Sequence, residues 1–283
     1  MASTVGTIMA ILVFLSLMAL ITNSYVPAWM LDNEREHMNQ VIDQFGELKG
    51  KVDSMVVQWT VRGGPSSNMY APISLGSSGV PLFASPTIGI LATAPQDSSI
   101  SAIEMTFDPD GRGLLTDRGG GKVELYCPNR YYVQQWLAYE NGAIIMKQED
   151  GQALRAYPGL VFSNTSSGVN IQFTKIDIVG PGTIVSGSGS VGLNIEMVYV
   201  ESETYSLSGE WKLKLTTEYG EAWTTYLEGA FSQQGMVNGT DYKLASKPVT
   251  DAKTDVTIID LTVKNVNVLT VDNAVVRMTT VDS

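Results

Sequence analysis

Hydrophobic positions change their spacing along the chain, and the first regime is a continuous apolar run. From residue 5 to residue 21 almost every side chain is apolar, and no charged residue occurs before Asp32. An uncharged helix of this length can cross a bilayer core of about 30 Å. No Lys or Arg precedes the run, which argues against a cleaved secretory signal. The pattern predicts an uncleaved transmembrane helix over residues 1–31.

The second regime has apolar residues at alternating intervals of three and four positions. This is the a/d rhythm of a coiled-coil seam, and it predicts a helical stalk over residues 32–57. Gly46 and Gly50 each lower the helix propensity by about 1 kcal/mol relative to alanine. The seam can pack against the chain's own C-terminal domain or against neighbouring copies. This stalk seam consists of Met38, Val41, Phe45, Leu48, Val52 and Met55.

From about residue 58 onward apolar and polar residues alternate with period two, as they do in Val191, Leu193 and Ile195. Such strands bury one face and expose the other, as in antiparallel sheets. Asn141-Gly142 and Asp150-Gly151 are the strongest hairpin signals. Because no helices alternate with these strands, residues 58–283 are predicted to form a β-sandwich-like domain. The fold class is therefore mainly β with an N-terminal α-helix.

Composition narrows the function classes. The net charge is −11, from 29 acidic and 18 basic residues, and a chain this acidic would repel nucleic-acid phosphates. Cys127 and His37 are the single cysteine and histidine, so an intrachain disulfide is impossible and nucleophilic or zinc chemistry has few candidates. We expect no enzyme activity, no cofactor and no metal site. Cys127 is expected to be a buried small apolar residue.

Two triplets match the N-x-[ST] acceptor pattern for N-glycosylation. They begin at Asn164 and Asn238, in turn-like surroundings of the predicted β domain. If that domain faces the outside of the cell, both asparagines are candidate glycan sites.

A resemblance to a known group rests on the N-terminal residues. Ser3-Thr4-Val5-Gly6-Thr7-Ile8, followed by an aliphatic run, resembles the first helix of archaeal type IV pilin-like proteins. The segments 25–29, 33–38 and 44–49 resemble the juxtamembrane part of uncharacterised archaeal surface proteins, in which a β-rich ectodomain follows the helix. The chain departs from pilins in two respects. No basic peptidase site precedes the helix, and the apolar run contains no acidic residue.

The resemblance implies a single-pass protein of the cell membrane with its C-terminal domain outside and a structural or adhesive role. Its partners would be membrane lipid and other copies of the chain, in a homo-oligomer or filament. The expected anchoring or assembly surface is Val5, Gly6, Ile8, Ile11, Leu12 and Leu15. The alternative is a monomeric membrane-anchored binding module that recognises a glycan or another envelope protein.

Overall fold

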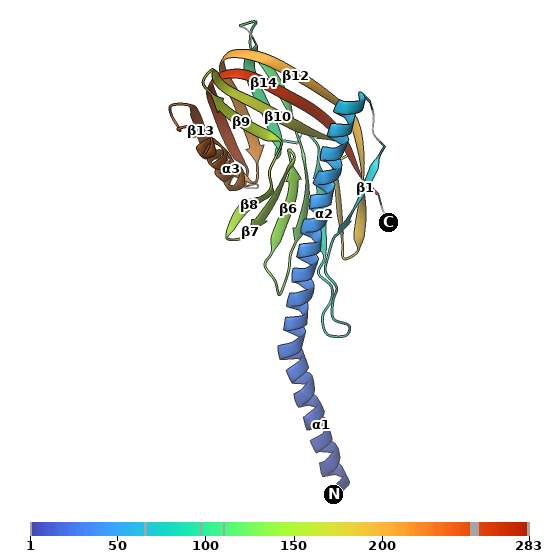
Figure 1. Ribbon diagram of the computed structural model, residues 1–283. Coiled ribbons are helices and arrows are strands. Elements are labelled where there is room, and N and C mark those ends of the chain that lie inside the picture. The colour runs from blue at the N-terminus through green and yellow to red at the C-terminus, as the bar shows by residue number, and fades with distance from the viewer. Residues whose placement is uncertain (1, 65–66, 97, 110, 250–254, 282–283) are drawn as a thin grey trace.

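The computed structural model describes the chain except for residues 1, 65–66, 97, 110, 250–254 and 282–283. One long N-terminal helix leads into a β-rich domain, which confirms the predicted fold class (Figure 1). The helix consists of α1 (Ala2–Leu20), a π-helical turn (Ile21–Tyr25) and α2 (Val26–Arg62). The first part projects alone from the domain, whereas α2 lies along the strands.

Pro27 explains the π-helical turn. Proline has no N–H to donate, and its ring collides with the carbonyl group one turn earlier in a regular α-helix. The wider turn before it relieves this clash, and the N–H of Val26 donates to the carbonyl of Ile21, five residues back. The helix therefore continues through the proline. It ends at Gly63, whose left-handed backbone (φ 68°) lets its N–H donate to Trp59.

The strands form two sheets. An eight-stranded sheet has the order β4-β3-β12-β14-β10-β9, with β1 added to β12 and β13 added to β14. Its strands are β1 (Met69–Ser74), β3 (Ala102–Pro109), β4 (Leu115–Gly120), β9 (Leu160–Thr165), β10 (Gly168–Val179), β12 (Ser190–Thr217), β13 (Tyr242–Pro248) and β14 (Thr257–Val281). A six-stranded sheet has the order β11-β2-β5-β6-β7-β8. Its strands are β2 (Gly89–Ala94), β5 (Lys122–Cys127), β6 (Gln135–Glu140), β7 (Ala143–Gln148), β8 (Gly151–Ala156) and β11 (Thr183–Gly187).

Pairing is mainly antiparallel, and among the described strands β10 and β14 pair in parallel. The predicted hairpins are present. Asn141 and Gly142 both have positive φ, 49° and 76°, as the two-residue turn between β6 and β7 requires. Between β7 and β8 the turn itself is made by residues 149–150, because Gly151 already pairs with Gln148.

The two longest strands divide the domain into two cores. The pairing of β12 with β14 shifts register around Gly209, opposite Val266, and Asn265 has a positive φ of 52°. Such bulges bend a strand. One half of the bent pair helps to bury α2, and the other half packs against α3 (Gly220–Gln233). No helix was predicted at α3, because its threonine, glycine and aromatic residues are poor helix formers.

The predicted stalk is not a separate element. All six residues of the stalk seam are at most 1% exposed, and they belong to the same core as strands of both sheets. The helix also runs to Arg62, beyond the expected boundary at residue 57. Of the two partners that the sequence allowed for the seam, the chain's own domain is the one that covers it.

Candidate functional site

In the part of the chain that the structure describes, the projecting helix carries the longest run of exposed apolar side chains. Its predicted anchoring residues Val5, Ile8, Ile11, Leu12 and Leu15 are 52–59% exposed, and Gly6 is also exposed. Exposure is similar on all sides, since Val13 and Phe14 are 58% and 60% exposed. Among the described residues, this is the one helix long and apolar enough to cross a membrane. An apolar surface of this size that is exposed on all sides of a helix is typical of a segment that contacts lipid or protein.

The projecting part is shorter than the predicted span of residues 1–31. Tyr25 and Trp29 are 50% and 46% exposed, but Val26 and Met30 are buried to 3% and 0%. The domain therefore reaches down to Val26. A helix from residue 4 to residue 25 rises about 33 Å, which matches the thickness of a bilayer core.

Glu34 ties the helix to two loops of the domain. Its carboxylate is fully buried and accepts a hydrogen bond of 2.7 Å from the Thr87 hydroxyl. It also accepts three backbone N–H groups, from Arg130 (3.0 Å), Tyr131 (2.8 Å) and Tyr132 (2.7 Å). A buried carboxylate is tolerated when hydrogen bonds replace its water, and here four donors do so. The contact fixes the angle between the helix and the domain.

The sequence contains a signal for Glu34 that the analysis of apolar residues missed. Glu34 lies four positions before Met38, which is the next position of the same three-and-four rhythm. A charged residue at a seam position is expected to be buried and hydrogen-bonded. The seam therefore extends one step further toward the membrane than its apolar members indicate.

His37 lies one turn beyond Glu34 and lines a polar pocket of about 320 Å³ with Ser77 and other serines. Its Nε2 donates to the carbonyl of Ser74 at 3.1 Å, so Nδ1 is the acceptor nitrogen of the ring. Within the described part of the chain, Nδ1 and the buried hydroxyl of Ser77 have no hydrogen-bond partner. Burial lowers the pKa of His37, although the Ser74 carbonyl and the charge of Glu34 oppose the shift.

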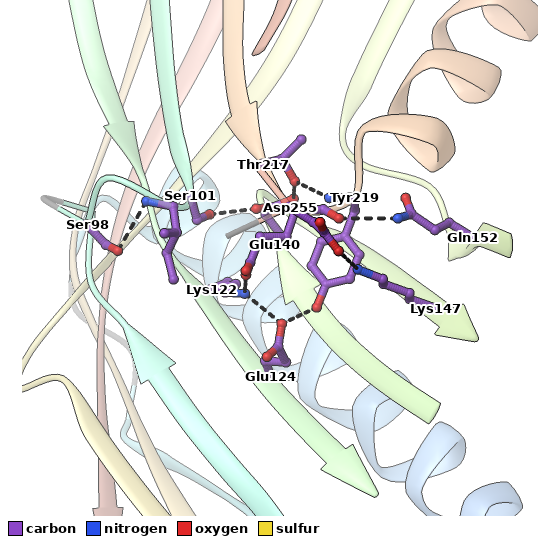
Figure 2. A network of polar contacts seen from close by, with 12 residues as sticks. Ser98, Ser101, Lys122, Glu124, Glu140, Lys147, Gln152, Thr217, Tyr219 and Asp255 are labelled. Carbon is purple, nitrogen blue, oxygen red and sulfur yellow. Dashed lines mark hydrogen bonds and ion pairs between the residues drawn. The ribbon is translucent and has the colours of Figure 1, made fainter. Parts of the chain in front are cut away.

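A second buried carboxylate, Glu140, lies between the sheets beside α3 (Figure 2). It accepts hydrogen bonds from Ser101 (2.7 Å), Thr217 (2.7 Å) and the indole N–H of Trp223 (2.8 Å). Burial raises the pKa of Glu140, and these hydrogen bonds and the charge of Lys122 oppose the shift. The group joins both sheets and α3, so its position indicates a structural role.

Lys122 continues this network toward the surface (Figure 2). It is 3% exposed and forms ion pairs with Glu124 at 2.6 Å and with Glu218, while the hydroxyl of Tyr219 donates to Glu124. Burial lowers the pKa of Lys122, but the two carboxylates outweigh it and the pKa is raised. The ammonium group is thus permanently charged and paired, which does not suit a catalytic amine.

A third charged cluster joins β10 to β4. Lys175 is fully buried and pairs with Asp117 at 2.8 Å and Asp177 at 3.0 Å, and it donates to the carbonyl of Arg118 at 3.1 Å. Burial raises the pKa of Asp177, against the effect of Lys175 and of the Gly120 N–H. All three protons of the ammonium group have acceptors, so this cluster too is saturated.

A largely apolar pocket of about 450 Å³ opens between α3 and the strands β8 and β9. The rings of Tyr157 and Tyr226 stack at its edge, with centroids 5.3 Å apart, and Tyr157 is 68% exposed. The Tyr226 hydroxyl is already used, because it donates to the carbonyl of Leu160 at 2.7 Å. The pocket therefore presents an aromatic ring face to a ligand, whereas the Tyr226 hydroxyl is not free to bind one.

The two candidate glycan sites are both exposed. Asn164 lies at the end of β9, where its amide group donates to the carbonyl of Gln234 at 3.4 Å. Asn238 lies in the connection between α3 and β13. Gln234 is at the C-terminal end of α3, so Asn164 contacts the start of the connection that contains Asn238. Cys127, in contrast, is fully buried as predicted, and burial raises its pKa to about 12.

The described side chains bring together structural ion pairs rather than a reactive constellation. Among these residues no group of three His, Cys, Asp or Glu side chains is arranged to hold a metal ion. The clusters around Glu34, Glu140 and Lys175 have in common that each joins elements distant in the chain. The projecting helix, the loops at its base and the pocket beside α3 are accessible.

Comparison with known proteins places the chain in one family. Residues 131–272 match the model of a family described as "Family of unknown function (DUF7289)". No curated protein and no solved structure matches the chain. The matched segment begins just before β6 and ends within β14, so it comprises much of both sheets and α3 but not the projecting helix. Because the match takes in half of the chain, the protein belongs to this family of unknown function, DUF7289.

Proposed function

We propose that the protein is a pilin-like surface protein, held in the cell membrane by its N-terminal helix, with a structural or adhesive role. The observation that carries the proposal is the contrast between the two parts of that helix. The segment up to Ile21 is almost entirely apolar and uncovered, and it is followed by the polar residues Thr22, Asn23 and Ser24, whereas the apolar stripe of α2 is fully used by the domain. Lipid, or the same segment of other copies, is the natural environment of the uncovered part.

The orientation proposed for the domain is extracellular. The residues after the apolar helix are acidic on balance, and the domain carries most of the net charge of −11. No basic residue flanks the beginning of this helix, so the positive-inside rule does not decide the orientation, and the proposal rests on the acidic, strand-rich character of the domain. Exposed Asn164 and Asn238 would then be accessible to a glycosylation machinery.

Of the two assembly surfaces expected from the sequence, the projecting helix is the one that stays exposed. The stalk seam is buried within the same chain and offers nothing to a neighbour. The candidate assembly surface is therefore reduced to the residues around Val5, Ile8 and Leu12, which are the residues that would also contact lipid. Anchoring and assembly thus compete for one surface.

The test compares the full-length protein, extracted in mild detergent, with a variant that lacks residues 1–25. The deletion stops at Tyr25 because Val26 and Met30 are part of the folded domain. Native mass and shape are measured for both by light scattering and electron microscopy. The proposal expects membrane association that depends on residues 1–25.

The result for the full-length protein then distinguishes the two roles of the helix. A defined oligomer or filament that disappears on deletion supports assembly. A monomer in both samples, with the full-length form found in membranes, supports anchoring alone. Full-length protein that fractionates without membranes and without detergent would contradict the proposal altogether.

The pocket beside α3 favours a second candidate, a membrane-anchored binding module for a glycan. A stacked tyrosine pair with one exposed ring is the kind of surface on which a sugar ring can lie. Binding to a glycan array, compared between the protein and Tyr157→Ala, tests this role. Equal binding by the two proteins would contradict it.

A further inference from the structure

The loop between β1 and β2 is held against the helix at two points close to the membrane segment. The amide group of Asn33 donates to the carbonyl of Ser78 at 3.1 Å, and the hydroxyl of Thr87 donates to Glu34 at 2.7 Å. Both ends of the segment 79–86 are thus fixed at the same level of α2. Figure 1 shows the β1–β2 connection descending along α2 toward α1, lower than the rest of the domain.

The tip of this loop is a tight turn with leucine in an unusual position. The N–H groups of Phe83 and Ala84 both donate to the carbonyl of Val80, at 3.0 and 2.9 Å. Pro81 is followed by Leu82, which has a φ of 69°. A turn with proline first and positive φ second ordinarily takes glycine or asparagine at the second place. Here the place is occupied by a leucine whose side chain is fully exposed.

The turn therefore presents apolar side chains where the backbone would prefer glycine. Phe83 is 37% exposed and Pro81 is exposed as well. Strained residues that persist in a fold are frequently functional, because a less strained residue would serve the fold equally well. The leucine is not explained by the packing of the domain, since its side chain is outside it.

The position of the loop along the helix indicates which partner the exposed turn contacts. Val26 and Met30 are buried, although they lie one to two turns below Asn33, so the domain extends to the end of the projecting apolar segment. Tyr25 and Trp29 lie at that level, with ring centroids 5.9 Å apart. Aromatic pairs of this kind are enriched at the boundary between membrane and water.

A second loop reaches the same end of the domain. The connection between β5 and β6 is held by the three N–H groups that bind Glu34, and its Tyr131 and Val133 are 40% and 44% exposed. The same segment contains Arg130, an exposed cation suited to lipid phosphate. Glu34 thus aligns two loops with exposed apolar residues beside one apolar helix.

We propose that the turn Val80–Ala84 inserts Leu82 and Phe83 into the interface of the lipid bilayer in which the helix is anchored. The inference rests on the proposed membrane anchoring and adds to it a second contact, which would hold the domain at a fixed tilt on the membrane. The apolar side chains of the turn lie at the same height along the helix axis as the end of the projecting segment. A bilayer that surrounds this segment would therefore also contact the turn, and this argues for lipid as the partner.

The test uses the full-length protein in phosphatidylcholine vesicles that contain acyl-chain-brominated lipid as a quencher. A fluorophore is attached to a single introduced cysteine, because Cys127 is fully buried and does not compete for the label. The three positions are Ser85→Cys beside the turn, Ser16→Cys in the helix, and Leu114→Cys in the β3–β4 connection. That connection is at the opposite end of the domain (Figure 1), and Leu114 is 74% exposed.

The expected result is quenching at residues 16 and 85 and none at residue 114. Leu82→Gly, made in the Ser85→Cys protein, should lose the quenching at residue 85. Since glycine suits the positive φ of the turn, this variant should unfold no earlier than its parent, so loss of quenching would not reflect loss of structure.

The other outcomes separate the two proposals. Quenching at residue 16 without quenching at residue 85 would overturn the inserted turn and leave membrane anchoring intact. Absence of quenching at residue 16 would overturn the anchoring itself. A label at residue 85 that is shielded from water but not quenched by lipid would mean that a second copy covers the turn, and the lipid contact would be rejected.

Discussion

The carboxylate of Glu34 and the hydroxyl of Thr87, 53 positions apart in the chain, meet at 2.7 Å in a fully buried contact. The same carboxylate collects three consecutive N–H groups from residues 130–132. A helix whose seam is held by apolar packing is thereby given one fixed register against the domain.

Replacement of Glu34 by alanine should be strongly destabilising, because four buried donors lose their acceptor. We expect a loss of about 3–5 kcal/mol in the free energy of unfolding. Urea titration in mild detergent, followed by tryptophan fluorescence, measures it. Glu36→Ala, which removes an exposed carboxylate two residues away, is the matched control and should change little. Similar losses for both variants would show that the contacts of Glu34 are not special.

Replacement of Gly46 and Gly50 by alanine should stabilise the protein. Both glycines lie in the middle of α2 on its exposed side, and an added Cβ would meet no atom within 4 Å outside the helix's own backbone. Each substitution is expected to add about 1 kcal/mol through helix propensity alone. Thermal unfolding monitored by circular dichroism is the measurement. A lower melting temperature would mean that another molecule packs closely on this face of the helix.

The single histidine gives a clean pH signal. Because burial lowers the pKa of His37, its ring should titrate below the ordinary value of 6.5 in the folded protein. As the pH falls below about 6.5, the unfolded chain binds the proton first, so stability should be lost between that pH and the folded pKa. Imidazole proton NMR reports the pKa, and His37→Gln should remove this part of the pH dependence. A midpoint above 6.5 would show that the hydrogen bond to the Ser74 carbonyl and the charge of Glu34 outweigh burial.

Replacement of Lys175 by methionine should leave the buried Asp177 without its cation. We expect a loss of about 3–5 kcal/mol near neutral pH. Burial already raises the pKa of Asp177, and removing the cation raises it further, so the loss should shrink as acid protonates the carboxyl group. Urea titrations at two pH values test this, with Lys212→Met, at a 56% exposed side chain, as the control. A loss that does not depend on pH would point to packing instead.

Much of the fold could be predicted because one face of each element is consistently apolar. The seam from Met38 to Met55 and the alternation around Leu193 correspond to buried faces in the structure. The turn at Asn141-Gly142 was predictable because two successive positive φ angles favour these residue types. These features depend on residues that are close together in the chain, so the sequence pattern alone predicts them.

The remaining features depend on contacts between distant segments. The parallel pairing of β10 with β14 leaves no mark in either strand's alternation. The buried charges Glu140 and Lys175 look like surface residues until their partners are known. Leu82 is missed for the opposite reason, because a single apolar residue after a proline does not suggest a left-handed turn.

The placement of α2 also determines when the protein can fold during its synthesis. The helix is made first, yet Ala274, Val276 and Met278, close to the end of the chain, belong to the core that covers it. Until β14 has left the ribosome, the apolar stripe of α2 remains open to water next to a membrane-seeking segment. Burial of this stripe must therefore wait for β14, and such long-range closure is slow. A chain terminated before β14 would leave the apolar stripe of α2 exposed. Chaperones bind such surfaces, and proteases degrade the chains that expose them.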